Sequence, residues 1–147
     1  MIPAFNQNGD LPVGVYSATL AEIVGRFGQG SSQRRTVAGR LERVHQIAHA
    51  TGHVARMIVF GSFVTDKDEP SDVDVVIIME DAFDPDQLAG EGKILFDNAA
   101  AQSHSGASVF WIRRFAIFGD PQEFIEDWQF KRDRQRRGIV EIVGETS

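Results

Sequence analysis

Apolar residues recur at two different spacings along this chain. Spacings of three and four residues predict one apolar stripe on a helix over residues 32–51. The stripe consists of Val37, Leu41, Val44 and Ala48. Runs rich in β-branched and aromatic residues predict four strands, at residues 54–60, 72–79, 108–115 and 139–143. Residues 75–78 in the second run are all apolar, which is typical of a strand buried on both faces.

Cap signals predict further helices, at about residues 19–27, 85–101 and 121–130. Thr19 and Glu22 have the spacing of a capping box, in which each side chain accepts a hydrogen bond from the other residue's backbone amide. Asp120 followed by Pro121 marks another helix start, because proline at the first helical position loses no hydrogen bond.

The order of these elements predicts an α/β (α+β) fold, with helices packed mainly on one face of a small mixed β-sheet of about four to five strands. The first 16 residues contain Pro3, Pro12 and Gly14 and are expected to form an irregular leader. No shift in composition marks a linker, so residues 1–147 are expected to form a single domain.

Composition narrows the classes of function. The formal net charge of −6 argues against a protein that coats nucleic acid, because phosphate contacts need a basic surface. The chain has no cysteine, which excludes disulfides and thiolate metal sites. No signal peptide is visible, and no apolar run approaches the ~20 residues of a membrane span. We therefore expect a cytoplasmic protein with no membrane partner.

The strongest candidate chemistry lies at the start of the second predicted strand. Residues two apart on a strand point to the same face, so Asp72 and Asp74 should project side by side, roughly 6–7 Å apart. Two neighbouring carboxylates repel each other, and a divalent cation would relieve this repulsion. Mg²⁺ prefers oxygen ligands and commonly takes carboxylates together with substrate phosphates. The simpler interpretation is that both aspartates cap a turn and face water.

Gly61 and Ser62 follow directly after the first predicted strand. A glycine lets a ligand approach the backbone closely, and a serine hydroxyl adds a hydrogen-bond donor. If a helix begins here, its free amides favour an anion. An anion-binding turn beside a metal-binding pair would suit phosphoryl or nucleotidyl transfer, in which positioning and charge neutralisation dominate catalysis. The alternative is an ordinary strand-to-helix turn.

This arrangement resembles the DNA polymerase β-like nucleotidyltransferase superfamily. The superfamily signature is a hydrophobic residue, Gly, then Ser or Gly, and after a gap Asp-hydrophobic-Asp. Here the pattern is Phe60-Gly61-Ser62, nine residues, and Asp72-Val73-Asp74. The resemblance covers about residues 54–118, and the segments 11–16 and 137–142 also resemble a group of short, uncharacterised bacterial members.

The resemblance implies a site that binds a nucleoside triphosphate with Mg²⁺ or Mn²⁺. Asp72 and Asp74 would be the metal ligands and catalytic residues, while Gly61 and Ser62 would hold the β and γ phosphates. Lys67 is the nearby cation and would add a phosphate contact. Short members of the superfamily are often paired with a helical, toxin-like protein, which implies a possible partner protein encoded nearby.

The chain departs from the superfamily pattern at the third carboxylate. The best placement puts Ser108 at this third-acid position, on a predicted strand that carries no acidic residue. A serine hydroxyl is neither a base near neutral pH nor a strong Mg²⁺ ligand. Asp97, expected on the preceding helix, would have to reach in from outside the motif. The simplest interpretation of Ser108 is a small residue on a crowded strand.

Two other clusters carry weaker signals. Three histidines repeat every four residues, at His45, His49 and His53. Zinc ligands can align in this way on a helix, but a polar helix flank is the simpler interpretation. A basic segment over residues 131–137 contains Lys131, Arg132, Arg134, Arg136 and Arg137. This segment is either a solvated turn or a surface that holds a triphosphate, an acidic partner or RNA.

Three functions remain open at this point. The first is an active nucleotidyltransferase that moves a nucleotidyl group from a triphosphate to a hydroxyl on a protein, an RNA or a small molecule. The second is a catalytically weak or inactive binding protein of the same fold, such as the antitoxin or regulatory half of a two-gene module. The third is an RNA-binding adaptor. The missing third acid favours the second function, and the two intact motifs favour the first.

Overall fold

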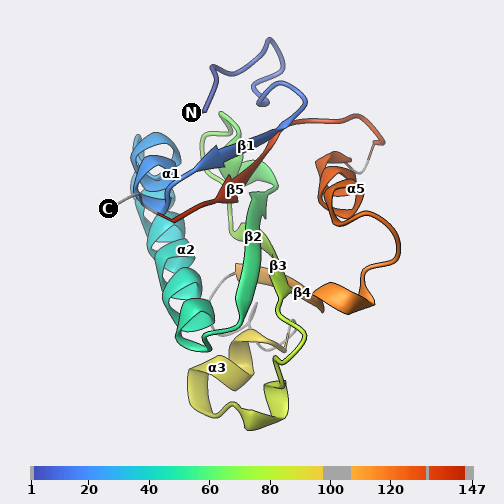
Figure 1. The fold of residues 1–147 in the computed structure, drawn as a ribbon. Coiled ribbons are helices and arrows are strands. Elements are labelled where there is room, and N and C mark those ends of the chain that lie inside the picture. The colour runs from blue at the N-terminus through green and yellow to red at the C-terminus, as the bar shows by residue number, and fades with distance from the viewer. Residues whose placement is uncertain (1, 98–106, 132, 145–147) are drawn as a thin grey trace.

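A mixed β-sheet forms the centre of the fold (Figure 1). The computed structural model describes residues 2–97, 107–131 and 133–144. The strands are β1 Val15–Ala18, β2 Val54–Phe60, β3 Val73–Met79, β4 Ala107–Arg113 and β5 Ile139–Ile142. Their order in the five-stranded sheet is β1-β5-β2-β3-β4. β1 is parallel to β5 and β3 is parallel to β4, whereas β2 is antiparallel to both β5 and β3.

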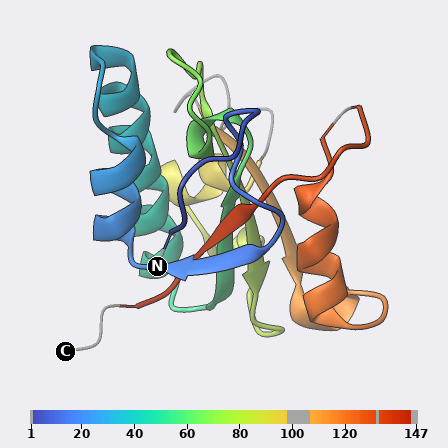
Figure 2. The same cartoon turned by 90° about the horizontal axis from the view of Figure 1, so that it is seen from above.

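Helices cover both faces of the sheet. They are α1 Leu20–Phe27, α2 Ser32–Ala50, α3 Gly90–Leu95 and α5 Pro121–Glu126. Figure 2 shows α1 and α2 on one side of the sheet and α5 on the other. Short 3₁₀ turns occur at η1 Ser62–Val64, η2 Pro85–Gln87, η3 Arg114–Ala116 and η4 Asp127–Gln129. This architecture confirms the predicted fold class. None of the described helices is both long and apolar enough to cross a membrane.

Side-chain caps start the first two helices, and the one at Thr19 was predicted. The Thr19 hydroxyl accepts a hydrogen bond from the Glu22 amide at 3.1 Å, and the Glu22 carboxylate accepts one from the Thr19 amide at 3.2 Å. α2 begins after Ser31, whose hydroxyl accepts a hydrogen bond from the Arg34 amide. Each cap of this kind contributes about 1 kcal/mol. The predicted apolar stripe of α2 is fully buried, as Leu41 illustrates.

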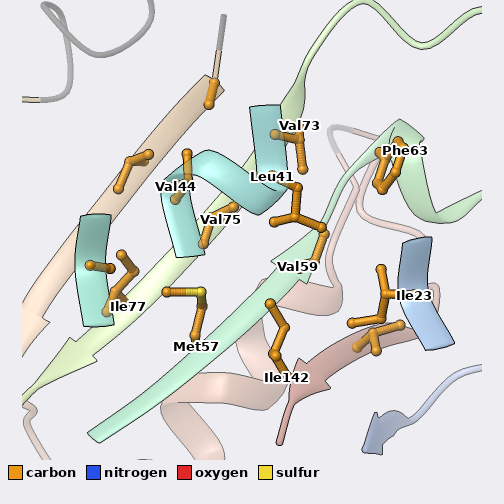
Figure 3. Close-up of a cluster of buried hydrophobic side chains, with 14 of the residues drawn as sticks. Ile23, Leu41, Val44, Met57, Val59, Phe63, Val73, Val75, Ile77 and Ile142 are labelled. Atoms are coloured by element: carbon orange, nitrogen blue, oxygen red, sulfur yellow. The ribbon is translucent and has the colours of Figure 1, made fainter. Parts of the chain in front are cut away.

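Side chains alternate between two cores on the two faces of the sheet. The odd-numbered residues of β3, from Val73 to Met79, pack toward α1 and α2 (Figure 3). Val76 and Ile78 pack on the opposite face, toward α5. Both faces of β3 are therefore covered, which explains its continuous apolar run. Because strand side chains alternate, Asp74 lies on the α5 face of the sheet.

The leader contains a strand, which corrects the prediction of an irregular segment over residues 1–16. β1 begins at Val15 and runs parallel to β5, with Val15 opposite Ile139 and Ala18 opposite Ile142. A four-residue edge strand gives little local signal, because its pairing depends on a partner near the other end of the chain. The sequence around it is dominated by turn-forming residues, which obscured the strand.

A break before α3 corrects the prediction of one helix over residues 85–101. η2 ends at Gln87, and the chain is extended at Leu88 and Ala89. α3 then starts at Gly90, whose φ of +60° is a conformation that glycine adopts without steric cost. Residues 98–101 lie outside the described residues. β4 and α5 also end earlier than predicted, and a 3₁₀ turn follows each of them.

Candidate functional site

The parallel pairing of β3 and β4 brings the two aspartates to Ser108. Asp74 pairs with Ser108 in the strand register, and Asp72 directly precedes β3. The Ser108 hydroxyl donates a hydrogen bond to Asp72 Oδ2 at 3.3 Å. The structure thus places Ser108 beside the acidic pair, where its side chain is within hydrogen-bond reach of Asp72.

Gly61 lies directly against Asp74. β2 and β3 are antiparallel with Phe60 opposite Asp74, so the chain passes the carboxylate at Gly61. A Cβ atom at Gly61 would lie 2.0 Å from Asp74 Oδ2. The backbone there has φ of +83° and ψ of −166°, a combination essentially restricted to glycine. Glycine at this position therefore leaves room for the Asp74 carboxylate.

Ser62 begins a short turn rather than a helix. η1 is three residues long, and the Val64 amide donates to the Gly61 carbonyl at 3.3 Å. The Ser62 carbonyl accepts from both the amide and the hydroxyl of Thr65, at 3.2 and 2.7 Å. A single 3₁₀ turn carries no appreciable helix macrodipole. Anion binding at this turn would therefore depend on the Ser62 hydroxyl and on local amides.

Arg34 of α2 holds the loop between β2 and β3 and was missed by the sequence analysis. Its guanidinium donates hydrogen bonds to the carbonyls of Phe27, Phe63, Thr65 and Lys67, at 2.5–3.0 Å. The side chain is buried. A buried arginine that satisfies four backbone carbonyls fixes the path of the chain on which Ser62 and Lys67 stand. The only sequence signal was its spacing, since Arg34 lies three residues before Val37 and so on the same helix face as the predicted apolar stripe.

The charge state of Arg34 is maintained in this environment. Burial lowers the pKa of its guanidinium, and the carboxylates of Asp66 and Asp68 act in the opposite direction. An arginine starts from a pKa so far above neutral that it stays protonated. The four carbonyls therefore receive charged hydrogen bonds, which are stronger than neutral ones.

Two further donors from α2 fix the end of the same loop. Gln33 Nε2 donates to the Pro70 carbonyl at 3.0 Å, and Arg40 donates to the Ser71 carbonyl at 3.2 Å. Asp72 follows Ser71 immediately, so these two hydrogen bonds hold the chain just before the acidic pair.

The basic segment, residues 131–137, forms a hairpin-like turn beside the sheet face that carries Asp74. The Lys131 amide donates to the Gln135 carbonyl at 2.7 Å, and the Arg137 amide donates to the Gln129 carbonyl at 3.0 Å. Arg132, one of the predicted basic residues, lies outside the described residues. The Asp133 carboxylate accepts a hydrogen bond from the Gln135 amide at 3.0 Å.

These segments enclose one cleft of about 600 Å³. Its lining residues are Ser62, Lys67, Ser71, Asp72, Asp74, Ser108, Lys131, Asp133 and Arg137. The volume falls within the usual range for small-molecule sites. Three of the lining side chains are carboxylates and three are cations, so the cleft offers ligands both for a metal ion and for an anion. Of the predicted site residues, Gly61 alone is absent from the lining, and it lies behind Asp74.

A second hollow, of about 380 Å³, lies between α2 and α3. It contains the Arg43–Glu91 ion pair and is otherwise lined by residues such as Ile47 and Leu88. It holds one carboxylate and therefore no acidic pair for a metal.

Asp97 and the histidines do not join the acidic cleft. Asp97 follows the end of α3 and does not line the cleft. The rings of His45 and His49 lie 4.2 Å apart between centroids, whereas His53 packs against Phe83. Within residues 2–97, 107–131 and 133–144, no three His, Cys, Asp or Glu side chains are placed to hold a metal ion together.

Comparison with protein families gives a match along nearly the whole chain. Residues 3–143 match DUF6932, which is described as a family of unknown function. The chain belongs to DUF6932. The matched region of this DUF6932 member includes every residue that lines the cleft. Comparison with curated proteins and with solved structures gives no match.

Proposed function

We propose that this DUF6932 protein binds a nucleoside triphosphate together with Mg²⁺ or Mn²⁺ in the cleft around Asp72 and Asp74. The observation that carries the proposal is the convergence of this acidic pair, the Ser62 hydroxyl and Lys67 in one cleft. The resemblance of the two sequence motifs to the DNA polymerase β-like nucleotidyltransferase signature supports the same ligand.

The donor set suits a hard divalent cation. Asp72 and Asp74 supply two carboxylates to one cleft, and the hydrogen bond from Ser108 orients Asp72. Mg²⁺ commonly uses one or two protein carboxylates and takes its remaining oxygens from substrate phosphates and water. When bound, the metal would neutralise charge on the phosphates and on the acidic pair. Ser62 and Lys67 would donate hydrogen bonds to the phosphate oxygens.

The proposal extends to transfer of the nucleotidyl group, which we expect the isolated chain to perform weakly. In this reaction an acceptor hydroxyl attacks the α phosphorus, its proton passes to a base, and pyrophosphate leaves. General-base help typically contributes about 10²–10⁴ in rate. Asp72 and Asp74 would be occupied as metal ligands, and Ser108 cannot take the proton near neutral pH. Asp133 is the remaining carboxylate of the cleft, and its Oδ1 accepts a hydrogen bond from the Gln135 amide within its own turn. The residues around the acidic pair thus favour binding over turnover.

A catalytically weak or inactive binding protein of the same fold is the second candidate. The observation that favours it is the placement of Ser108, rather than a carboxylate, beside Asp72. Such a protein would act as the antitoxin or regulatory half of a two-gene module, with a partner protein encoded nearby. Contact with RNA through residues 131–137 would belong to a separate, third function, that of an RNA-binding adaptor. Both candidates place the protein in the cytoplasm, where nucleoside triphosphates are available.

Calorimetric titration with Mg²⁺ and each of the four nucleoside triphosphates tests the proposal. We expect at least one Mg²⁺·nucleotide to bind, and the absence of binding by all four would refute the proposal. A label on the α phosphate then separates the two candidates, with and without the product of the neighbouring gene. Rapid transfer by the isolated chain, abolished by Asp74→Asn, would refute the second candidate.

A further inference from the structure

The N-terminal segment connects the two walls of the cleft. The Asp66 amide donates to the Gly9 carbonyl at 2.9 Å, which ties the segment to the loop after β2. The Gly138 amide donates to the Leu11 carbonyl at 2.9 Å, which ties it to the end of the basic hairpin. Figures 1 and 2 show this segment beside the loop that follows β2. The segment is therefore part of the structure that shapes the cleft.

Asp10 of this segment holds two of the cleft's cations. Lys131 Nζ lies 3.2 Å from Asp10 Oδ2, and an Arg137 guanidinium nitrogen lies 3.4 Å from Asp10 Oδ1. Asp10 is 6% exposed, and its backbone amide and carbonyl are both hydrogen-bonded to Asn6. A buried carboxylate needs compensating charge, so Asp10 fixes both side chains at this position.

The two cations carry more charge and more donors than Asp10 uses. The side chains of Asp10, Lys131 and Arg137 together carry a net charge of +1, although Asp133 and the acidic pair line the same cleft. A lysine ammonium has three N–H donors and an arginine guanidinium has five, while Asp10 offers one oxygen to each. Lys131 and Arg137 also line the cleft. Their remaining donors can therefore bind the oxygens of an anion in the cleft.

We infer that Lys131 and Arg137, held by Asp10, form an anion subsite that binds phosphate groups directly and without a metal. The subsite shares its cleft with the acidic pair. Only one part of the inference rests on the proposed function, namely that the bound phosphates are the triphosphate of a nucleotide. A compact triphosphate fits better than an RNA backbone, because Lys131 and Arg137 lie in one cleft of about 600 Å³ and the chain's net charge of −6 gives no extended basic surface for a long polyanion.

Titration with inorganic triphosphate in EDTA tests the subsite in the absence of divalent metal. We expect Lys131→Gln and Arg137→Gln each to weaken binding by roughly tenfold or more, because a charge-assisted contact to phosphate is lost. The matched control is Arg136→Gln, since the Arg136 guanidinium lies over the Phe130 ring and does not line the cleft. Binding by both variants at the wild-type affinity, or no binding by the wild type, would overturn the inference.

A further variant distinguishes loss of binding from loss of folding. Each single substitution leaves Asp10 with one cation, and thermal unfolding checks that the fold persists. The triple variant Asp10→Asn/Lys131→Gln/Arg137→Gln removes both cations without leaving an uncompensated buried carboxylate. It should unfold cooperatively and fail to bind triphosphate in EDTA. A folded triple variant that binds as the wild type does would contradict the inference.

The same titrations separate this inference from the proposed function. Asp72→Asn/Asp74→Asn should bind triphosphate in EDTA at least as tightly as the wild type, because two repelling charges are removed. Triphosphate binding that needs Lys131 and Arg137, without any binding of Mg²⁺·nucleotide, would support the subsite and refute the proposed function. If Mg²⁺·nucleotide binds equally well to the wild type, Lys131→Gln and Arg137→Gln, the proposed function would be supported and the subsite refuted. A single-stranded RNA with a 5′-hydroxyl that outcompetes triphosphate for these cations would overturn the assignment of the ligand.

Discussion

The Ser108 hydroxyl donates a hydrogen bond to Asp72 Oδ2 at 3.3 Å across the parallel pairing of β3 and β4. A neutral donor thus stands where the superfamily resemblance expects a third carboxylate. The bond orients Asp72, but it adds neither negative charge for a metal nor a base for an acceptor hydroxyl. Under the proposed function, the missing carboxylate at this position is the reason to expect binding without efficient turnover.

Ser108→Asp is expected to strengthen Mn²⁺ or Mg²⁺ binding by roughly tenfold, because a third oxygen ligand would face Asp72. Without metal, the same variant should unfold at a lower temperature than the wild type, since three carboxylates would repel one another. Ser108→Asn is the matched control because it adds similar volume without charge. Equal metal affinity of the two variants, measured by calorimetry, would show that Ser108 does not face the metal position.

Gly61→Ala is expected to destabilise the protein by about 1–3 kcal/mol, since the backbone conformation there is strained for any other residue. The new Cβ would also displace the Asp74 carboxylate, so metal binding should weaken as well. Gly39→Ala in α2 is the control. Its Cβ would contact nothing within 4 Å, and alanine in an exposed helix should stabilise the fold by about 0.5–1 kcal/mol. Chemical denaturation curves that shift in the same direction for both variants would contradict this account.

Arg34→Met is expected to cost about 2–4 kcal/mol of unfolding free energy, because buried carbonyls lose their charged donor. Nucleotide binding should also weaken, because the loop that carries Ser62 and Lys67 is no longer held. Arg35→Met changes the neighbouring, exposed arginine and serves as the control. If Arg34→Met is no less stable in urea than Arg35→Met, the loop is fixed by other contacts.

The histidine pair on α2 predicts a pH dependence of stability. Burial lowers the pKa of His45 and of His49 below the ordinary value of 6.5, and the neighbouring His49 lowers the pKa of His45 further. The folded state therefore favours the neutral imidazoles. The contribution of the neutral imidazoles to the unfolding free energy is fully present above pH 6.5. It is lost as the pH falls through the lowered pKa values of the folded state.

The double variant His45→Gln/His49→Gln isolates this effect from the protonation of carboxylates. Between pH 7.5 and 5, the unfolding free energy of the wild type should fall more steeply than that of the variant, because only the wild type takes up these protons on unfolding. Parallel curves for the two proteins would contradict the prediction.

Local patterns in the sequence were sufficient to predict several of the fold's elements, including the strand that carries the acidic pair. The apolar run of β3, the Thr19–Glu22 capping box and the helical stripe through Leu41 are all encoded within a few residues. The strand period also indicated that Asp72 and Asp74 share a face, and both line the cleft.

Contacts between distant segments could not be predicted in this way. β1 depends on pairing with a strand near the other end of the chain. Arg34 and Asp10 act through hydrogen bonds and ion pairs to residues far along the sequence, so neither has a local signature. Glycine is needed at position 61 because the strand register places the Asp74 carboxylate against its backbone. The spacing of the sequence motif does not specify that register.

The most direct test of the central claim measures Mn²⁺ binding in the presence of a nucleoside triphosphate. The paramagnetic resonance signal of free Mn²⁺ decreases as the ion binds, and this decrease is the readout. The wild type should bind Mn²⁺ and nucleotide together, and Asp72→Asn/Asp74→Asn should lose this binding while remaining at least as stable without metal. The control Asp86→Asn/Glu123→Gln removes two exposed carboxylates that do not line the cleft, and it should bind as the wild type does. Equal Mn²⁺ binding by the wild type and by Asp72→Asn/Asp74→Asn would contradict the account.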